Sequence, residues 1–146
     1  MEQQVEMLLR GGQFRHLLES QIQAVREQYG LKKIDVEILF YLSRNRQHNT
    51  AKEMQQSLHL NKGHISQAMD GLCRRGLVTA ETDPEDRRYV HYSTTEPAAK
   101  IVQDVSEAWQ RMNGIIFEGI TEEETETLRR VAEKINGNIE RMLENR

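Results

Sequence analysis

The fold is decided by residues 50–95, which read TAKEMQQSLHLNKGHISQAMDGLCRRGLVTAETDPEDRRYVHYSTT. This stretch begins with the pattern of a capping box, in which the Thr50 hydroxyl and the Glu53 carboxylate each accept a hydrogen bond from a free backbone N–H. A helix is therefore predicted from this box to about Leu58. Asn61 is a residue type favoured at helix starts, and it predicts a second helix that continues to residue 75 before Gly76 ends it.

The second of these helices has an apolar face and a polar face. At 3.6 residues per turn its apolar side chains fall on one side, and they are Ile65, Ala68, Met69 and Leu72. The opposite side carries Gly63, Gln67, Asp70 and Arg74, flanked by His64 and Ser66. Short or hydrogen-bonding side chains near the helix start suit entry into a DNA major groove. An ordinary amphipathic surface helix gives the same pattern, so this helix does not decide the function alone.

Two segments of β-forming residues follow, joined by a turn. Residues 77–82 and 89–94 are rich in β-branched and aromatic side chains, and Asp-Pro-Glu-Asp at positions 83–86 is turn chemistry. Arg87 and Arg88 lie just past the tip, where a guanidinium can reach a phosphate, enter a minor groove or pair with a carboxylate of the turn. We expect one arginine to pair with Asp86 and the other to point outward. Two helices and a hairpin in this order outline a winged helix-turn-helix.

Several runs in this stretch together resemble the MarR family of bacterial transcriptional regulators. They are LNKGHISQ at 60–67, Leu72, GLV at 76–78 and DPEDRR at 83–88. The resemblance extends over nearly all 146 residues. It implies a mainly α fold with a small β-hairpin wing, in which an N-terminal helix and two C-terminal helices form a dimer interface. It also implies that Arg88 is the structural arginine and Arg87 the one for the minor groove. The chain departs from the family at Glu85, where many members have an arginine.

Together, the resemblance and the helix pattern predict a DNA-binding surface. Its residues are Thr50, Asn61, Lys62, Gly63, His64, Ser66, Gln67, Arg74, Arg87 and Arg88. We expect Gln67, Ser66 and His64 to contact base edges, because their side chains hydrogen-bond and Gln matches adenine. Lys62, Arg74 and Arg87 have the charge for phosphates or the minor groove, and the helix start at Thr50 offers N–H groups to a phosphate.

The charge of the chain is distributed unevenly, although its net value is −3. Residues 44–75 contain six basic and two acidic side chains, whereas residues 96–146 contain seven basic and eleven acidic ones. Basic side chains therefore gather where the fold places DNA. Binding of phosphates depends on such a local patch rather than on the net charge.

Apolar stripes predict helices on both sides of this lobe. The N-terminal stripe is Phe14, Leu17, Leu18, Ile22 and Val25, with Val5, Leu8 and Leu9 before a break at Gly11 and Gly12. Residues 31–45 predict a helix of the lobe itself, Pro97 begins a later helix, and a second capping box at residues 121–124 begins the last. The outer stripes lack partners within so small a lobe, so we expect a two-fold interface with a second copy. An intramolecular bundle is the alternative.

We therefore expect one MarR-like domain over residues 1–146, with dimerisation helices in 1–30 and 96–146 and the winged helix lobe in 31–95. The resemblance also implies an effector pocket between the lobe and the dimer helices, where His16, Tyr41 and Trp109 are plausible lining. A small aromatic or anionic molecule is the expected ligand.

Other functions find little support in the sequence. The five histidines are scattered and Cys73 is the only cysteine, so neither a metal site, a cofactor nor an enzyme is expected. A thiol enzyme using Cys73 lacks a positioned base. With no run of 18 apolar residues and no signal peptide, a cytoplasmic protein without membrane contact is expected. The predicted function is a homodimeric regulator that binds a pseudo-palindromic double-stranded DNA operator. The alternative is a winged helix adaptor that binds protein instead.

Overall fold

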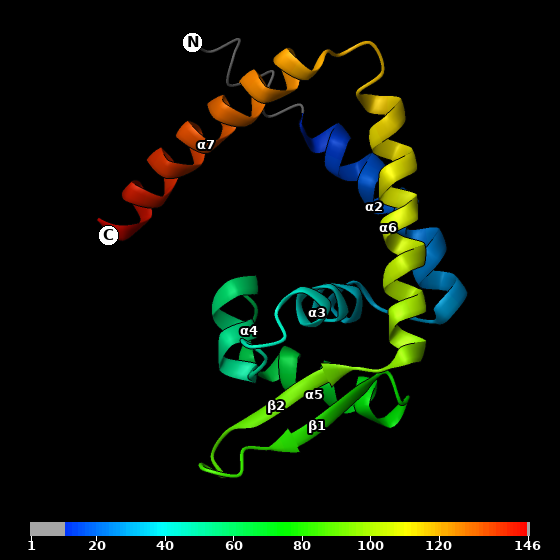
Figure 1. Cartoon of the computed structure of the whole chain (residues 1–146), viewed down its shortest axis with the longest axis vertical. Helices are drawn as coiled ribbons and strands as arrows, with labels where there is room; N and C mark the ends of the chain where they lie inside the picture. The colour runs from blue at the N-terminus through cyan, green and yellow to red at the C-terminus, as the bar shows by residue number, and fades with distance from the viewer. Residues whose placement is uncertain (1–10, 146) are drawn as a thin grey trace. The chain divides into compact units, whose positions relative to one another are not determined.

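The structure is a computed structural model that describes residues 11–145 (Figure 1). Its elements are α2 (Gly11–Tyr29), α3 (Lys33–Arg44), α4 (Ala51–Leu58), α5 (Lys62–Arg74), β1 (Val78–Thr82), β2 (Val90–Thr94), α6 (Glu96–Ile116) and α7 (Glu122–Glu144). The predicted mainly helical fold with a two-stranded wing is confirmed. Val5, Leu8 and Leu9 lie outside the described residues, and so does the side chain of Phe14.

The helix starts follow the predicted caps. The Thr50 hydroxyl accepts a hydrogen bond from the Glu53 backbone at 3.3 Å, and the Glu53 carboxylate accepts one from the Thr50 backbone at 3.0 Å. Asn61 caps α5 by accepting from the Gly63 backbone at 2.8 Å. The α5 helix ends at Arg74, one residue earlier than predicted, and Gly76 follows with φ of 70°, a conformation that glycine adopts without strain.

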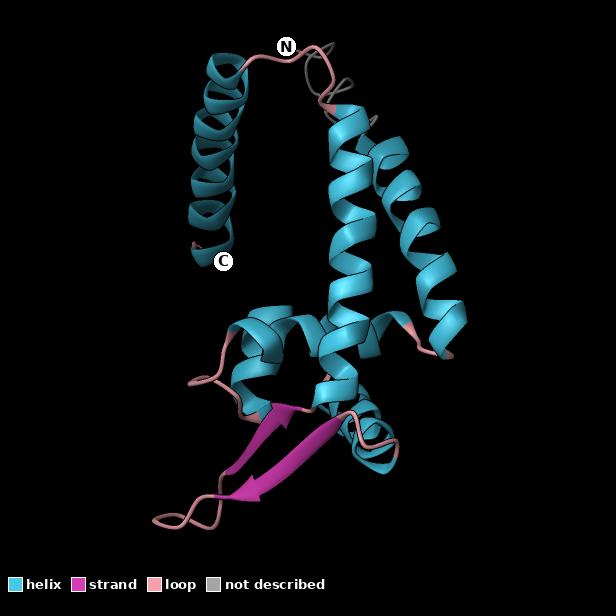
Figure 2. Ribbon diagram, turned by 45° about the vertical axis from the view of Figure 1, so that its right-hand side comes forward, coloured by secondary structure: helices cyan, strands magenta, loops and turns pink. Residues whose placement is uncertain are grey.

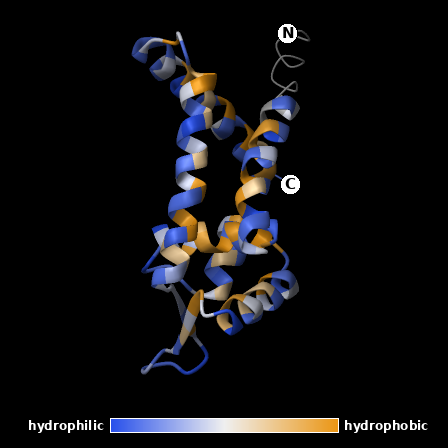
Figure 3. Ribbon diagram, turned by 90° about the vertical axis from the view of Figure 1, so that its right-hand side faces the viewer, coloured by the Kyte–Doolittle hydropathy of each residue, from blue (hydrophilic) through white to orange (hydrophobic). Residues whose placement is uncertain are grey.

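The apolar face of α5 forms part of the lobe core, as its sequence pattern predicts. Ile65, Ala68, Met69 and Leu72 are all buried, and Ile38, Leu39 and Met54 from α3 and α4 are among the side chains packed with them. Apolar residues gather where these helices meet (Figure 3). Burial of this face fixes α5 in the lobe and leaves its other face toward solvent.

The wing is an antiparallel hairpin that extends from the helical lobe (Figure 2). Val78 pairs with Thr94 at its base and Thr82 with Val90 near its tip. Each strand begins one residue later than predicted. Val78 is the one buried residue of β1, and Tyr92 of β2 packs against the core beside it.

The chain divides into two compact units, one that ends at Met112 and one that begins at Asn113. In the first unit, α6 buries Ala98, Ile101, Val105 and other small or apolar residues, while α2 contributes Ile22 and Val25 to the edge of the core. The second unit contains α7, which starts with the predicted capping box at Thr121 and has no buried residue.

Candidate nucleic-acid interface

The polar face of α5 is available to a partner along its whole length. All six predicted residues from Asn61 to Gln67 are exposed, and they are Asn61, Lys62, Gly63, His64, Ser66 and Gln67. Arg74 is exposed at the far end of the same helix. The start of α4 lies close by in the chain, but the Thr50 hydroxyl is already engaged in its cap, where it also donates to Glu53 at 2.9 Å. Both the hydroxyl and the backbone N–H of Thr50 are therefore engaged within the cap.

A hollow of about 680 Å³ runs beside α5. His64, Gln67 and Arg74 form its α5 wall, and the start of α3 forms the other wall with Lys32 and Lys33. The sequence pattern of the DNA surface did not include these two lysines. Asp35 and Glu37 line the same wall, and Lys33 is paired with Glu19 at 2.8 Å. The positive end of the helix dipole disfavours two lysines at a helix start, and this was the feature of the sequence that could have drawn attention to them.

Arg75, one of the six basic residues counted in the DNA-binding region, is bonded within the protein. Its guanidinium donates to the backbone oxygens of Gly30, at 3.1 Å, and Tyr29. These are carbonyls at the end of α2, where the helix itself provides no donors. Arg75 therefore ties α5 to α2, and these donors of its guanidinium are not free to bond a phosphate, although the side chain keeps its charge.

The wing tip is held together by its acidic residues. Asp83 accepts hydrogen bonds from the backbone N–H groups of Glu85 and Asp86, at 2.8 and 3.2 Å. Arg88 makes a two-point pair with Asp86, with Nε to Oδ1 at 3.0 Å and Nη2 to Oδ2 at 2.7 Å. This pairing holds the pKa of the Asp86 carboxyl below its usual range. Arg88 thus stiffens the tip, as predicted, and Arg87 beside it is exposed.

A second polar cluster joins the wing to the lobe. The His91 ring lies between Asn49 Oδ1, at 2.6 Å from Nδ1, and Asp83 Oδ2, at 2.9 Å from Nε2. The pKa of Asp83 is lowered by its hydrogen bond with His91 first and by the two backbone N–H groups next. The sequence did not reveal Asn49 and His91 as a pair because 42 positions separate them.

Comparison with known proteins agrees with the winged helix arrangement of α4, α5 and the wing. Residues 31–98 match the family model for the winged helix DNA-binding domain. A MarR protein from Peptoclostridium difficile matches with a TM-score of 0.78 and 21% identity, over 93% of this chain and 88% of that one. The transcriptional regulator PA3341 matches with a TM-score of 0.75 and 25% identity, over 94% and 97%. Residues 31–98 therefore match a winged helix domain, and the chain has the fold of these solved MarR structures.

A third solved structure with the MarR fold is a complex with DNA. It is that of S. aureus MepR, which matches with a TM-score of 0.65 and 19% identity, over 88% of this chain and 96% of that one. The resemblance noted in the sequence is therefore confirmed at the level of the fold.

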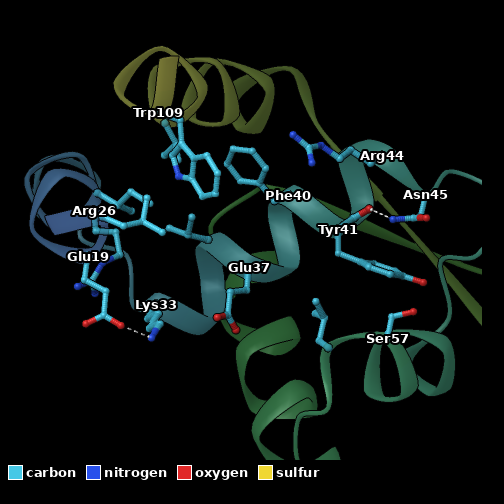
Figure 4. A pocket seen from close by; sticks show the side chains of 15 residues that line it. Glu19, Arg26, Lys33, Glu37, Phe40, Tyr41, Arg44, Asn45, Ser57 and Trp109 are labelled. Atoms are coloured by element: carbon cyan, nitrogen blue, oxygen red, sulfur yellow. Dashed lines mark hydrogen bonds and ion pairs between the residues drawn. The ribbon is translucent and has the colours of Figure 1, made fainter. Parts of the chain in front are cut away.

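This MarR-fold protein also has a pocket of about 590 Å³ within its first unit (Figure 4). The pocket is lined by Leu18, Glu19, Ile22, Arg26, Lys33, Val36, Glu37, Phe40, Tyr41, Arg44, Asn45, Ser57, Leu58, Val105 and Trp109. Trp109 is 41% exposed, so much of its indole is free to contact a ligand. The Tyr41 hydroxyl donates to the His48 backbone at 2.7 Å and is therefore already satisfied.

His16 does not belong to this pocket, and its placement there needs correction. It is exposed on α2, where Leu18, Glu19, Ile22 and Arg26 line the pocket and His16 does not. At 3.6 residues per turn, His16 lies roughly 60° beyond Glu19, at the edge of the pocket face, and roughly 160° from Leu18. The prediction of His16 considered its residue type and not its position around the helix.

The charged groups of the pocket are partly paired. Lys33 donates to Glu19 at 2.8 Å, and the Arg44 guanidinium lies 5.4 Å from the centre of the Phe40 ring. Within the described residues, no cluster of three or more His, Cys, Asp or Glu side chains is placed to hold a metal ion. The helices described are also all too short or too polar to cross a bilayer.

Proposed function

We propose that the protein is a homodimeric transcriptional regulator that binds a pseudo-palindromic DNA operator. The observation that carries this proposal is the division of α5, whose apolar face is buried in the lobe while its polar start is exposed beside the wing. In this docking, α5 enters the major groove and Arg87 reaches the flanking minor groove. Lys32 joins the phosphate contacts from the far wall of the hollow beside α5.

Dimer formation is proposed from α7. Its apolar side chains Leu128, Val131, Ile139 and Met142 are between 46% and 72% exposed, and they recur at intervals of three, eight and three residues. Such a stripe on a helix without buried residues favours association with another helix. A second copy of this chain also doubles the modest basic surface of one lobe. The whole chain then functions as one MarR-like domain.

An effector is proposed for the pocket of the first unit. Trp109 and Phe40 provide aromatic surface, and Arg26 and Arg44 provide positive charge. These groups suit a small aromatic or anionic molecule. Measuring operator affinity with and without such compounds tests this proposal. Compounds that bind the pocket and leave operator affinity unchanged would count against it.

Selection of bound duplexes from a random pool tests the main proposal. We expect enrichment of a repeated half-site whose two copies are related by two-fold symmetry, because two copies of α5 contact DNA in the same way. Binding should weaken steeply as the salt concentration rises. Failure to enrich any duplex, together with salt-independent binding of a protein partner, would favour the adaptor function instead.

A further inference from the structure

The wing is joined to the lobe by a short chain of polar side chains. Asn49, at the end of the loop before α4, contacts His91 on β2, and His91 contacts Asp83 at the wing turn. Asn49 is the only buried polar residue of the part of the chain that the structure describes, with 7% exposure. Its backbone oxygen also accepts a hydrogen bond from Tyr92 at 3.0 Å. The wing is therefore anchored at Asn49 through both backbone and side chain.

The orientation of the Asn49 amide decides what the His91 ring must do. Asn49 Nδ2 donates to the Arg46 backbone oxygen at 3.1 Å, so Oδ1 is the atom that faces the ring. An amide oxygen only accepts, and Nδ1 must therefore carry a hydrogen. The ionised carboxylate of Asp83 also only accepts, and Nε2 must carry one as well. Both contacts exist together only when the ring is doubly protonated.

We propose that His91 is a positioning residue whose doubly protonated ring holds the wing on the lobe, so that the wing's contribution to DNA binding falls as the pH rises. This inference rests on the proposed DNA-binding function. A neutral ring has one N–H, so one of its two contacts becomes a repulsion between lone pairs. The bridge is complete at low pH and incomplete after the ring loses its proton. Histidine is the side chain that makes this change near neutral pH.

Several charged groups surround the ring. Asp83 faces it from the turn, and Glu81 is its partner across the strands of the wing. Asp86 lies next to Asp83 in the same turn and is paired with Arg88. On the lobe side the ring meets the neutral Asn49, while the nearby Glu53 is paired with His48. The acidic groups therefore outnumber the free basic ones on the wing side.

Movement of the wing matters because Arg87, the arginine proposed to reach the minor groove, is on it. Arg87 and Arg88 follow the turn that Asp83 organises. Leu77, Val78 and Tyr92 fix the base of the hairpin on the core, and the Tyr92 backbone bonds to Asn49. The bridge through His91 is the contact that reaches the turn at Asp83, so we expect its loss to affect the tip more than the base.

Operator affinity as a function of pH tests this inference with the full chain and a selected operator duplex. Between about pH 6 and about pH 8, we expect the operator affinity of the wild type to fall about fivefold more than the operator affinity of His91→Gln. A factor of about five is the effect of losing one hydrogen bond. The matched control is His48→Gln, because His48 is exposed in the same loop and contacts a carboxylate through one ring nitrogen only. This control should keep the wild-type pH dependence.

Ring nitrogen chemical shifts of His91, measured without DNA, provide the second readout. We expect both nitrogens to carry a hydrogen whenever both contacts of the bridge are formed. Should His91→Gln not fold, as judged by thermal unfolding, Asp83→Asn takes its place and should reduce the pH dependence. A His91 ring with only one protonated nitrogen throughout the pH series, or a pH dependence that survives the substitution, overturns this inference and leaves the proposed function standing. A protein that binds no duplex at any pH overturns the proposed function and this inference with it.

Discussion

Single residues of α5 should differ in what they contribute, because base contacts and phosphate contacts fail in different ways. Gln67 is exposed in the middle of the polar face. Gln67→Ala should cost about 1 to 3 kcal/mol on the preferred operator and relax discrimination at one position per half-site. Titrations against operator and scrambled DNA measure this. Equal losses on both duplexes would contradict the proposed base contact.

Lys62, at the start of α5, should contact a phosphate rather than a base, because its ammonium group is exposed and positively charged. Lys62→Ala should weaken binding to all duplexes alike. The slope of log affinity against log salt should decrease by about 0.9 for each phosphate that is no longer neutralised, or about 1.8 for a dimer. A changed base preference with an unchanged salt slope would show that α5 docks differently.

Cys73 should be inert to oxidants. The thiol is half-buried near the end of α5, and burial first, then the charge of Asp70, raises its pKa. Mild peroxide should leave operator binding unchanged in wild type and in Cys73→Ser. Loss of binding in the wild type alone would make Cys73 a redox sensor.

At the level of elements, the sequence predicted well what is encoded by neighbours in the chain. Both capping boxes and the Asp86–Arg88 pair join residues at most three positions apart, so their patterns are visible in the sequence. The buried face of α5 followed from helical periodicity. Contacts between His91 and Asn49, and between Arg75 and α2, join residues more than 40 positions apart. Only the folded arrangement brings them together.

The contact between α5 and α2 leads to a prediction about these elements. Arg75→Ala removes two hydrogen bonds to carbonyls at the end of α2 and should reduce the free energy of unfolding by about 1 kcal/mol. Arg75→Lys should keep part of this stability. Urea unfolding of both variants measures the effect, with Arg74→Ala as the control, because Arg74 bonds only within its own helix at Asp70. A control as unstable as Arg75→Ala would argue against the tie to α2.

For the whole molecule, two copies of α5 must be held at a fixed spacing if the operator has two half-sites. The lobe supplies one copy of α5 and one wing. The apolar side chains of α7 are exposed, and this helix has no buried residue. If two copies associate through α7, as we propose, dimer formation determines the affinity for a two-site operator.

Substitution of Ile139 by glutamate tests that link. Ile139→Glu places a charge in the exposed apolar stripe and should weaken dimerisation about tenfold or more, since burying one isoleucine contributes about 1.5 to 3 kcal/mol. Gly137→Glu is the matched control, because it adds the same charge to the same helix where a Cβ meets no atom within 4 Å. Sedimentation should show monomers for Ile139→Glu and dimers for the control. Operator affinity should fall only in the first variant, because a single lobe contacts one half-site. A dimeric Ile139→Glu variant would mean that the stripe on α7 is not the dimer contact.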